Sequence, residues 1–301
     1  MIVHAKLLLT AVFWGGTFIA GRLVAQSVGP YSAAFLRFAA ASACLLFLVR
    51  RIEGRWPPLK PSQRLAMLVL GLSGVFTYNV LFFKGLKLIA AGRASLIIAN
   101  NPILIALLSV VFFKQRLTAL QGLGILMSVS GAAVVISNGQ IGRLLQGPLS
   151  AGDLYIFGAV LSWVTYSLVG KGVLRGLSPL VAVAYSATLG AVCLLWPALG
   201  EGLWASMRGY PAVAWLGLGY LAIFGTVLGF LWYYEGIQAI GATRASLFIN
   251  FVPVSAVLMA FVILGEPLTF ALLAGAALVT GGVFLTNRFA HQGQAHRPAG
   301  T

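Results

Sequence analysis

Three asparagines lie inside stretches of sequence that are otherwise apolar. Asn100, Asn101 and Asn250 precede Pro102 or Pro253 by a turn or less. A proline removes a backbone donor and frees a carbonyl one turn earlier, and freed groups inside a membrane are tolerated only against protein or a wet cavity. Amide side chains beside such a kink could bind a solute. They could equally join neighbouring helices by hydrogen bonds.

Arg37 is the only basic residue well inside an apolar stretch. A charge in that position is costly and usually faces a cavity, where it could bind the carboxylate of a solute. Its long side chain could instead extend toward the outer membrane interface, about two turns away.

Aromatic residues form three pairs at helical spacing: Trp14 with Phe18, Tyr78 with Phe82, and Trp163 with Tyr166. Tryptophan usually concentrates at membrane interfaces, whereas Trp14 and Trp163 lie in the middle of their apolar stretches. Such rings could wall a site for a planar or apolar solute. Ordinary side-chain packing explains each pair equally well.

The composition is that of a helical membrane protein. Hydrophobic residues make up 60% of the 301 residues and charged residues 8%, whereas a soluble domain carries about 25% charged residues. We therefore expect an all-α chain that crosses the lipid bilayer repeatedly. The net charge of +15 does not indicate nucleic acid as a partner. The basic residues stand singly or in short groups between apolar runs, as in loops that fix membrane topology.

Residues suited to catalysis or metal binding are scarce. Cys44 and Cys193 lie inside apolar stretches, and His4, His291 and His296 lie near the termini. The sequence shows no catalytic triad, metal cluster or phosphate-binding glycine loop. We therefore expect no cofactor, no bound metal and no enzymatic activity, and a monomer would suffice.

The chain resembles itself at an offset of about 150 residues. At an offset of 151, 12 of the 42 positions from Arg93 to Val134 are identical, whereas chance would give roughly one in ten. Nearer the N-terminus the offset is 149, and it pairs Trp14 with Trp163. The sequence thus predicts two halves, residues 1–150 and 151–301.

Ten stretches reach the length of about 20 apolar residues that a membrane span needs. They cover residues 5–25, 31–49, 65–86, 92–113, 118–137, 152–171, 178–198, 212–235, 243–264 and 268–288. Five spans per half give the second half the opposite orientation, so the sequence predicts two inverted-topology five-helix repeats. Lys84 and Glu235 would then lie near opposite faces and should not pair.

The distribution of charge predicts the orientation and the coupling. Thirteen Lys and Arg residues fall on the side that holds both termini and six on the other, which places both termini in the cytoplasm. The five acidic residues fall in loops or at span ends. Proton relays usually use carboxylates inside the membrane, so we expect facilitated transport or exchange.

Several motifs are similar to those of the drug/metabolite transporter superfamily, in particular its EamA-type ten-helix members. They are Trp14-Gly15-Gly16-Thr17, Leu36-Arg37-Phe38 after Pro30, Ala94-Ser95 leading to Pro102, and Gly265-Glu266-Pro267-Leu268-Thr269. The resemblance covers nearly the whole chain and implies a central cavity and alternating access. Within the superfamily the chain looks most like the YddG-type bacterial exporters of aromatic amino acids. The first half departs from the last motif, because Lys114-Gln115-Arg116 stands where the second half has Gly265-Glu266-Pro267.

These observations predict a secondary transporter of the bacterial inner membrane that exports small organic metabolites, including aromatic amino acids. Repeat-based transporters bind their solutes near the bilayer midplane, where the halves meet. An importer of sugars or other metabolites has the same architecture and is the alternative. A channel would also fit the architecture, whereas a membrane enzyme would need a polar catalytic cluster.

Overall fold

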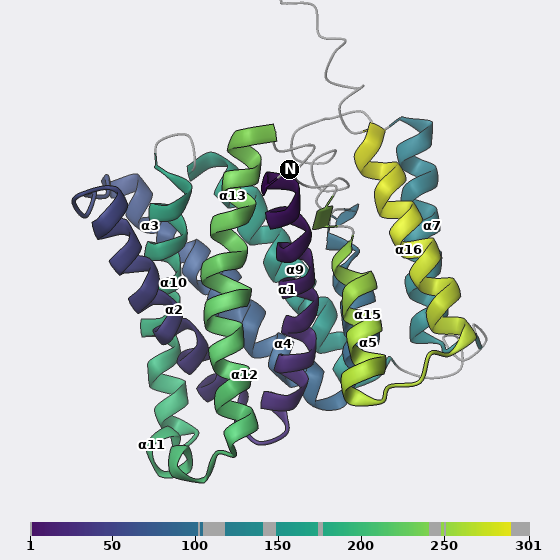
Figure 1. Ribbon diagram of the computed structural model, residues 1–301, viewed down its shortest axis with the longest axis horizontal. Coiled ribbons are helices and arrows are strands. Elements are labelled where there is room, and N and C mark those ends of the chain that lie inside the picture. Colours follow the sequence, from purple (N-terminus) through teal and green to yellow (C-terminus); the bar gives the residue numbers. More distant parts are fainter. Residues whose placement is uncertain are drawn as a thin grey trace, which may run out of the picture.

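The computed structural model describes residues 2–101, 103–104, 118–140, 149–173, 177–240, 248–249 and 251–289. Within these ranges the regular structure is helical throughout, and none of the described residues forms a strand. Asn250, Pro102 and the segment 114–116, which the sequence singled out, lie outside the described residues. Figure 1 shows the helices running roughly side by side between two ends of the molecule.

The described helices cover eight of the predicted spans with ends shifted by a few residues, whereas the predicted spans 92–113 and 243–264 lie partly outside the described residues. The first half contains α1 (Ile2–Ala25), α2 (Pro30–Ile52), α3 (Pro61–Leu70), η1 (Gly71–Thr77), α4 (Tyr78–Leu88), α5 (Ala91–Ile98) and α7 (Ala119–Ile136). The second half contains α9 (Ala151–Val173), α10 (Pro179–Gly200), α11 (Leu203–Ser206), η2 (Met207–Gly209), α12 (Ala212–Ala222), η3 (Ile223–Leu228), α13 (Gly229–Ile240), α15 (Phe251–Leu264) and α16 (Phe270–Phe289).

Among the described residues, six helical stretches are long and apolar enough to cross a membrane, and two further apolar helices are shorter. Two of the six are composite, because α3, η1 and α4 form one continuous stretch, and α12 and η3 continue into α13. Large apolar side chains are also widely exposed, among them Phe270 at 88% and Trp196 at 83%. Such exposure is unfavourable in water and is expected where lipid covers the surface.

Helices α2 and α10 begin and end in the same way. Each has a proline, Pro30 or Pro179, at its first position, where a missing N–H costs nothing. Each is followed by a Glu-Gly pair in which the glycine has a positive φ, 69° at Gly54 and 76° at Gly202. Glycine takes that backbone conformation without steric penalty, so it ends the helix sharply.

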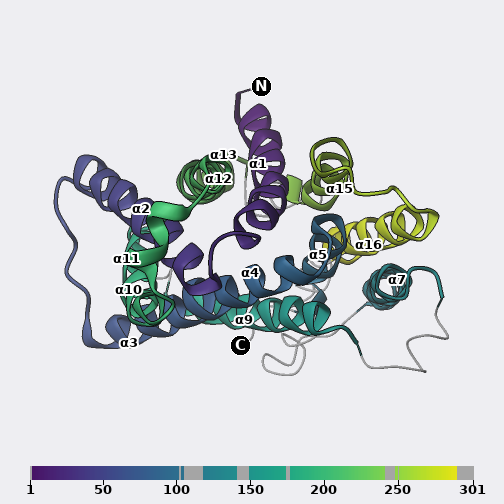
Figure 2. The same cartoon turned by 90° about the horizontal axis from the view of Figure 1, so that it is seen from below.

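The contacts between the halves are reciprocal. Helix α1 packs against α12, α13 and α15 of the second half, and its counterpart α9 packs against α3, α4 and α5 of the first. Helices α2 and α10, which correspond to one another, pack together, and so do α7 and α16. Figure 1 shows the α7–α16 pair at one edge of the molecule, and Figure 2 shows α1 beside α12, α13 and α15.

Glycines allow the close approach of α7 and α16. A Cβ atom on Gly124 would lie 2.7 Å from the carbonyl oxygen of Gly282, and one on Gly131 would lie 2.8 Å from that of Gly275. The sequence offset of 151 pairs Gly124 with Gly275 and Gly131 with Gly282. Each contact is therefore repeated with the roles of the halves exchanged, as at an interface with a local twofold axis.

Candidate functional site

Two short segments of widened, π-helical backbone lie at equivalent positions in the two halves. They are η1 (Gly71–Thr77) and η3 (Ile223–Leu228). Tyr78 donates its backbone N–H to the carbonyl of Ser73, five residues back, and Gly229 donates to Phe224 in the same way. Both pairs obey the offset of 151. Such widened turns are rare and often occur at functional sites, so the candidate site is centred on them.

The first helix of each half supplies donors to the widened turn of the other half. Ser162 of α9 donates its hydroxyl to the carbonyl of Ser73 at 2.7 Å. Trp14 of α1 donates its ring N–H to the carbonyl of Gly225 at 3.0 Å. The Ser73 carbonyl also accepts the backbone N–H of Tyr78, so Ser162 is its second donor. Trp14 gives the Gly225 carbonyl a donor from the opposing half, and buried backbone carbonyls need such partners.

Equivalent glycines also make room for the opposing first helix. A Cβ atom on Gly225 would lie 2.7 Å from a methyl carbon of Thr17, and a Cβ atom on Gly74 would overlap the ring of Tyr166. Thr17 and Tyr166 occupy equivalent positions in α1 and α9. The two halves thus meet twice in the same backbone arrangement, but with different side chains.

Arg37 of α2 lies at one of these two meeting points. It is buried, at 7% exposure. Its Nη1 donates to Asn79 Oδ1 at 3.0 Å, and its Nε and Nη2 donate to Thr226 Oγ1 at 3.3 and 3.2 Å. The Asn79 amide donates to the carbonyl of Val75 and the Thr226 hydroxyl to that of Leu221, which orients both acceptors. Arg37 therefore joins α2 and α4 of the first half to η3 of the second.

The charge of Arg37 is not neutralised within the described residues. All five acidic residues of the sequence are described, and each has another partner. Glu235 pairs with Lys6, Asp153 with Arg93, Glu201 accepts from Tyr31 and Ser32, Glu266 accepts from Ala91 and Gly92, and Glu53 accepts from Ser178. Removing an ion from water costs several kcal/mol, and neutral acceptors offset this cost less completely than a counter-ion does. The interior thus holds one positive charge that an anion would stabilise.

The Arg37 side chain turns into the protein and does not extend toward the end of the molecule at which α2 begins. Its acceptor Thr226 follows Ala212, the first residue of α12, by 14 residues. At 1.5 Å per residue, Thr226 lies roughly 20 Å along that helical stretch. Of the two alternatives that the sequence left open, the structure supports an inward-facing arginine.

Five of the predicted aromatic residues form one continuous cluster. Successive ring centroids are 5.5 Å apart for Phe18 and Phe82, 5.9 Å for Phe82 and Tyr78, 5.2 Å for Tyr78 and Trp163, and 5.2 Å for Trp163 and Tyr166. These rings, which we call the ring cluster, come from α1 and α4 of the first half and α9 of the second. Tyr78 directly precedes Asn79, the acceptor of Arg37 Nη1, so the ring cluster reaches the residue next to a ligand of the buried charge.

Trp14, the sixth predicted ring, contacts a different set of rings. Its ring lies 5.6 Å from that of Phe230 and 5.4 Å from that of Tyr233, between centroids. A Cβ atom on Gly229 would lie 2.6 Å from Trp14 Nε1. Gly229 is the equivalent of Tyr78. The two equivalent tryptophans therefore differ, because Trp163 faces a ring where Trp14 faces a glycine.

The two described asparagines beside the proline have different surroundings. α5 ends at Ile98, so the helix is interrupted just before them. Asn100 donates to the carbonyl of Leu96 and accepts from Ser128 of α7 at 2.8 Å, which joins two helices. Asn101 is 9% exposed, and its Oδ1 is buried without a hydrogen-bond partner among the described residues. The Asn101 side chain therefore has an acceptor left over in the described part of the chain, whereas the Asn100 side chain joins two helices.

The sequence analysis missed two residues of the site, Asn79 and Thr226. Each is a polar residue in an apolar span, and that pattern alone could have marked them. It also missed the capping role of the acidic residues. Glu201 accepts from the backbone N–H of Ser32 at 2.8 Å, at the start of α2, and Glu53 accepts from the Ser178 hydroxyl at 2.6 Å, at the start of α10. The shared Glu-Gly pair after α2 and α10 was the available signal.

Charged residues at the ends of the helices are paired separately from the site. Glu235 accepts from Lys6 at 2.6 Å. Lys84, its equivalent, lies 5.7 Å from the ring centroid of Tyr155. Among the described residues, Glu235 thus pairs with Lys6, and Lys84 lies against an aromatic ring.

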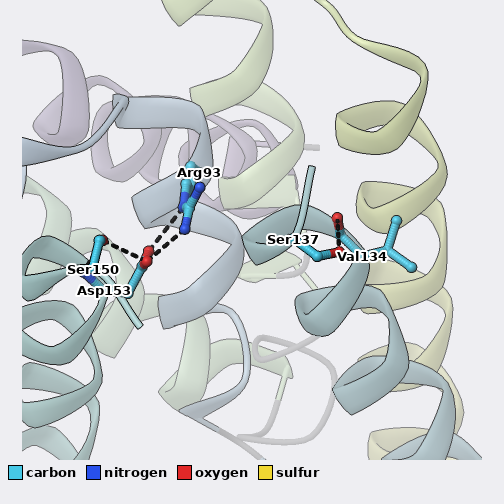
Figure 3. Close-up of polar contacts among 5 residues, drawn as sticks. All are labelled: Arg93, Val134, Ser137, Ser150 and Asp153. Atoms are coloured by element: carbon cyan, nitrogen blue, oxygen red, sulfur yellow. Dashed lines mark hydrogen bonds and ion pairs between the residues drawn. The ribbon is translucent and has the colours of Figure 1, made fainter. Parts of the chain in front are cut away.

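A further ion pair joins α5 to α9. Arg93 Nε donates to Asp153 Oδ1 at 2.8 Å, and the Ser150 hydroxyl donates to the same carboxylate at 2.5 Å. Figure 3 shows these three side chains converging, while Ser137 forms a separate local bond to the carbonyl of Val134 at the end of α7. Asp153, the most buried acid at 3% exposure, is fully used in this pair.

The fold and the site are those of an all-helical, multi-pass membrane protein with polar and aromatic residues buried where its halves meet. The model of the EamA-like transporter family matches residues 1–137 and 150–288. The chain belongs to this family and is a membrane transporter.

Relatives along nearly the full length are transporters as well. The chain is 34% identical over 281 residues to "Uncharacterized transporter YyaM" of Bacillus subtilis, covering 93% of this chain and 92% of the relative. It is 31% identical to "Probable terminal-alkyne amino-acid exporter" of Streptantibioticus cattleyicolor, covering 94% and 92%. A crystal structure aligns with 96% of this chain and 98% of its own, with a TM-score of 0.64 and 20% identity. At that identity it supports the fold alone.

Proposed function

We propose that the protein is a secondary transporter of the bacterial inner membrane that exports small organic metabolites, among them aromatic amino acids. The observation that carries this proposal is the ring cluster, which runs from α1 and α4 of one half to α9 of the other. Apolar and aromatic walls with few polar groups suit a solute with an apolar or aromatic side chain. The relative named as an amino-acid exporter supports the same solute class.

The proposed architecture is two inverted-topology five-helix repeats, residues 1–150 and 151–301, with ten spans and both termini in the cytoplasm. The reciprocal glycine contacts of α7 and α16 support it, as do the equivalent π-helical segments. Alternating access would follow from one half rocking against the other around a fixed site. Single cysteines in 138–151 should react with an impermeant reagent in intact cells, and those in 50–64 should not. The reverse labelling would contradict the orientation.

The proposed site lies where the halves meet. The described residues proposed to line it are Trp14, Phe18, Arg37, Tyr78, Phe82, Asn101, Trp163 and Tyr166. Asn250, which the sequence also predicted for the site, lies outside the described residues, and the predicted Asn100 bonds to Ser128 instead. Thr226 and Asn79 join this set on the strength of their bonds to Arg37. The solute would enter between η1 and η3, the π-helical segments of the described spans.

The proposed transport is facilitated diffusion or exchange down the solute gradient. All five acidic residues lie outside the middle of the spans or are already paired or capping, which leaves no free carboxylate beside the site. A pH gradient alone should therefore not drive accumulation of solute in liposomes. Accumulation under those conditions would contradict this coupling.

Counterflow in proteoliposomes tests the function directly. Vesicles preloaded with unlabelled phenylalanine should transiently accumulate labelled phenylalanine, because a carrier exchanges solutes while a channel only equilibrates them. Trp163→Ala and Tyr78→Ala should slow this exchange while the protein stays monodisperse in detergent. Counterflow of a hexose without counterflow of any amino acid would favour the importer of sugars instead.

A further inference from the structure

We propose that Arg37 binds the carboxylate of the transported solute, so that the transporter requires one carboxylate attached to an apolar or aromatic body. This inference rests on the proposed function and specifies its solute class. It follows from the free donors of Arg37, from its missing counter-ion and from the position of the ring cluster.

The hydrogen bonds of Arg37 leave suitable donors free. A guanidinium has five N–H donors. The bonds to Asn79 and Thr226 use the Nε donor, one donor on Nη1 and one on Nη2. One N–H therefore remains on each Nη atom, and two N–H groups are what a bidentate carboxylate accepts.

The protein positions the arginine but does not neutralise it. Asn79 and Thr226 hold the guanidinium from two directions, and both are themselves held by backbone carbonyls. A site that is rigid and positively charged before the solute arrives loses little flexibility on binding. A single arginine matches one carboxylate, whereas a multiply charged phosphate would need a cluster of cations.

The ring cluster comes near the arginine at Tyr78, which directly precedes Asn79, the acceptor of Arg37 Nη1. From Tyr78 the rings continue to Trp163 and Tyr166 in one direction and to Phe82 and Phe18 in the other. A solute with its carboxylate on Arg37 could lay its apolar body along these rings. The equivalent position in the second half holds Ser186, so the two halves provide a single charged anchor.

Competition experiments on the wild-type protein test the requirement for a carboxylate. Exchange of labelled phenylalanine would be challenged with 3-phenylpropionate, which keeps the carboxylate, and with phenylalaninamide, which lacks it. 3-Phenylpropionate should compete at concentrations close to those of unlabelled phenylalanine. Phenylalaninamide should need a roughly 10- to 100-fold higher concentration, the expected loss for a hydrogen-bonded charge.

Variants of Arg37 test which residue imposes the requirement. Arg37→Gln should raise the KM for phenylalanine by roughly 10- to 100-fold and remove the preference for phenylalanine over its amide. Arg37→Lys keeps the charge but loses the planar fork, so it should fall in between. Arg208→Gln is the matched control, since it removes an exposed arginine in η2, outside the site, and should leave the KM unchanged. A general folding defect would lower the rate for both solutes without changing their ratio.

The outcomes separate the two proposals. If phenylalanine is exchanged but its amide competes equally well, or if Arg37→Gln keeps the wild-type preference, the carboxylate anchor is wrong and the proposed function stands. If the wild-type protein exchanges hexoses and no carboxylate-bearing solute, both proposals are wrong. The competition arm uses the wild-type protein, so it remains decisive even if an Arg37 variant fails to fold.

Discussion

The two widened turns have the same backbone conformation but are surrounded by different side chains. Around η3, the opposing helices contribute Thr17, Trp14 and the cationic Arg37. Around η1, the equivalent positions hold Tyr166, Trp163 and Ser186. Within the turns, Thr226 of the second half replaces Val75 of the first, and directly after the turns Gly229 replaces Tyr78. One meeting point is polar and charged, and the other is filled with rings.

This difference suggests how a duplicated protein acquires a directional site. Two identical meeting points would offer the solute two equivalent anchors. Here both halves keep the π-helical turn, but the charged residue lies at the turn of one half and the aromatic rings lie at the turn of the other. A solute with a charged end and an apolar end would then have a single preferred orientation between the halves, which the following substitutions can test.

The largest expected effect comes from filling the gap at Gly229. Gly229→Leu places a side chain where Trp14 Nε1 lies 2.6 Å from the position of a Cβ atom. Overfilling a close-packed interior of this kind costs about 3 kcal/mol. We expect the midpoint of thermal unfolding in detergent to fall and exchange activity to be lost.

Gly219→Leu is the matched control for this substitution. Gly219 lies ten residues earlier in the same helical stretch, and a Cβ atom there would meet nothing within 4 Å. The change should alter the free energy of unfolding by less than about 1 kcal/mol. If both variants unfold alike, the close contact between Trp14 and Gly229 does not exist.

Part of this arrangement was predictable from the sequence alone. The hydrophobic runs predicted the helical fold. The internal offset and the spacing of aromatic residues predicted that Tyr78, Phe82, Trp163 and Tyr166 belong to one site. These features are local or periodic, so they can be recognised in the sequence without knowledge of the three-dimensional structure. The predicted ends of the spans were less accurate, because helix ends depend on caps such as Glu201, which come from distant parts of the chain.

The rest of the site depends on tertiary contacts that no local pattern encodes. The acceptors of Arg37 lie 42 and 189 residues away in the sequence. The carbonyls of the π-helical turns accept a donor from the opposing helix, such as the ring N–H of Trp14. Trp14 is not part of the ring cluster, because the residue beside it is Gly229, the equivalent of Tyr78. The spacing of residues along α1 cannot reveal this neighbour.

Thr226→Val makes η3 more similar to η1, because Val75 occupies the equivalent position in η1. The shapes of the two side chains are nearly the same, so the change removes the acceptor for two of the three Arg37 hydrogen bonds. A hydrogen bond to a charged group contributes about 2 kcal/mol. We expect the free energy of unfolding to fall by about that amount in denaturant titrations in detergent.

The control for Thr226→Val is Thr226→Ser, which keeps the hydroxyl and should recover most of the lost stability. If Thr226→Val is as stable as the wild-type protein, Thr226 does not hold the arginine. The charged anchor would then depend on Asn79 alone.

The two equivalent tryptophans offer a smaller and closely matched test. Trp14→Phe and Trp163→Phe remove the same atoms, but the Trp14 ring N–H also satisfies the carbonyl of Gly225 in η3. Leaving a buried carbonyl unpaired costs about 1 to 2 kcal/mol. Trp14→Phe should therefore be the less stable variant by that margin. Equal stabilities would mean that water or another donor reaches the widened turn.

The smallest expected effects lie at the ends of the helices, where the halves also differ. Glu235 pairs with Lys6, whereas its equivalent Lys84 lies over Tyr155. The side chains of Lys6 and Glu235 are 34% and 42% exposed, so solvent weakens their attraction. Glu235→Gln and Lys84→Gln should each lower the free energy of unfolding by less than about 1 kcal/mol.

Glu235→Gln also tests the proposed coupling, because Glu235 is the acid that a proton-coupled mechanism would have to use at the end of α13. With its charge already engaged by Lys6, the residue should not carry protons for transport. Phenylalanine exchange by this variant should match the wild type both with and without a pH gradient across the liposome membrane. A response to pH that is present in the wild type and absent in Glu235→Gln would reverse this assignment and place the coupling at the end of the helix, away from the charged and aromatic meeting points.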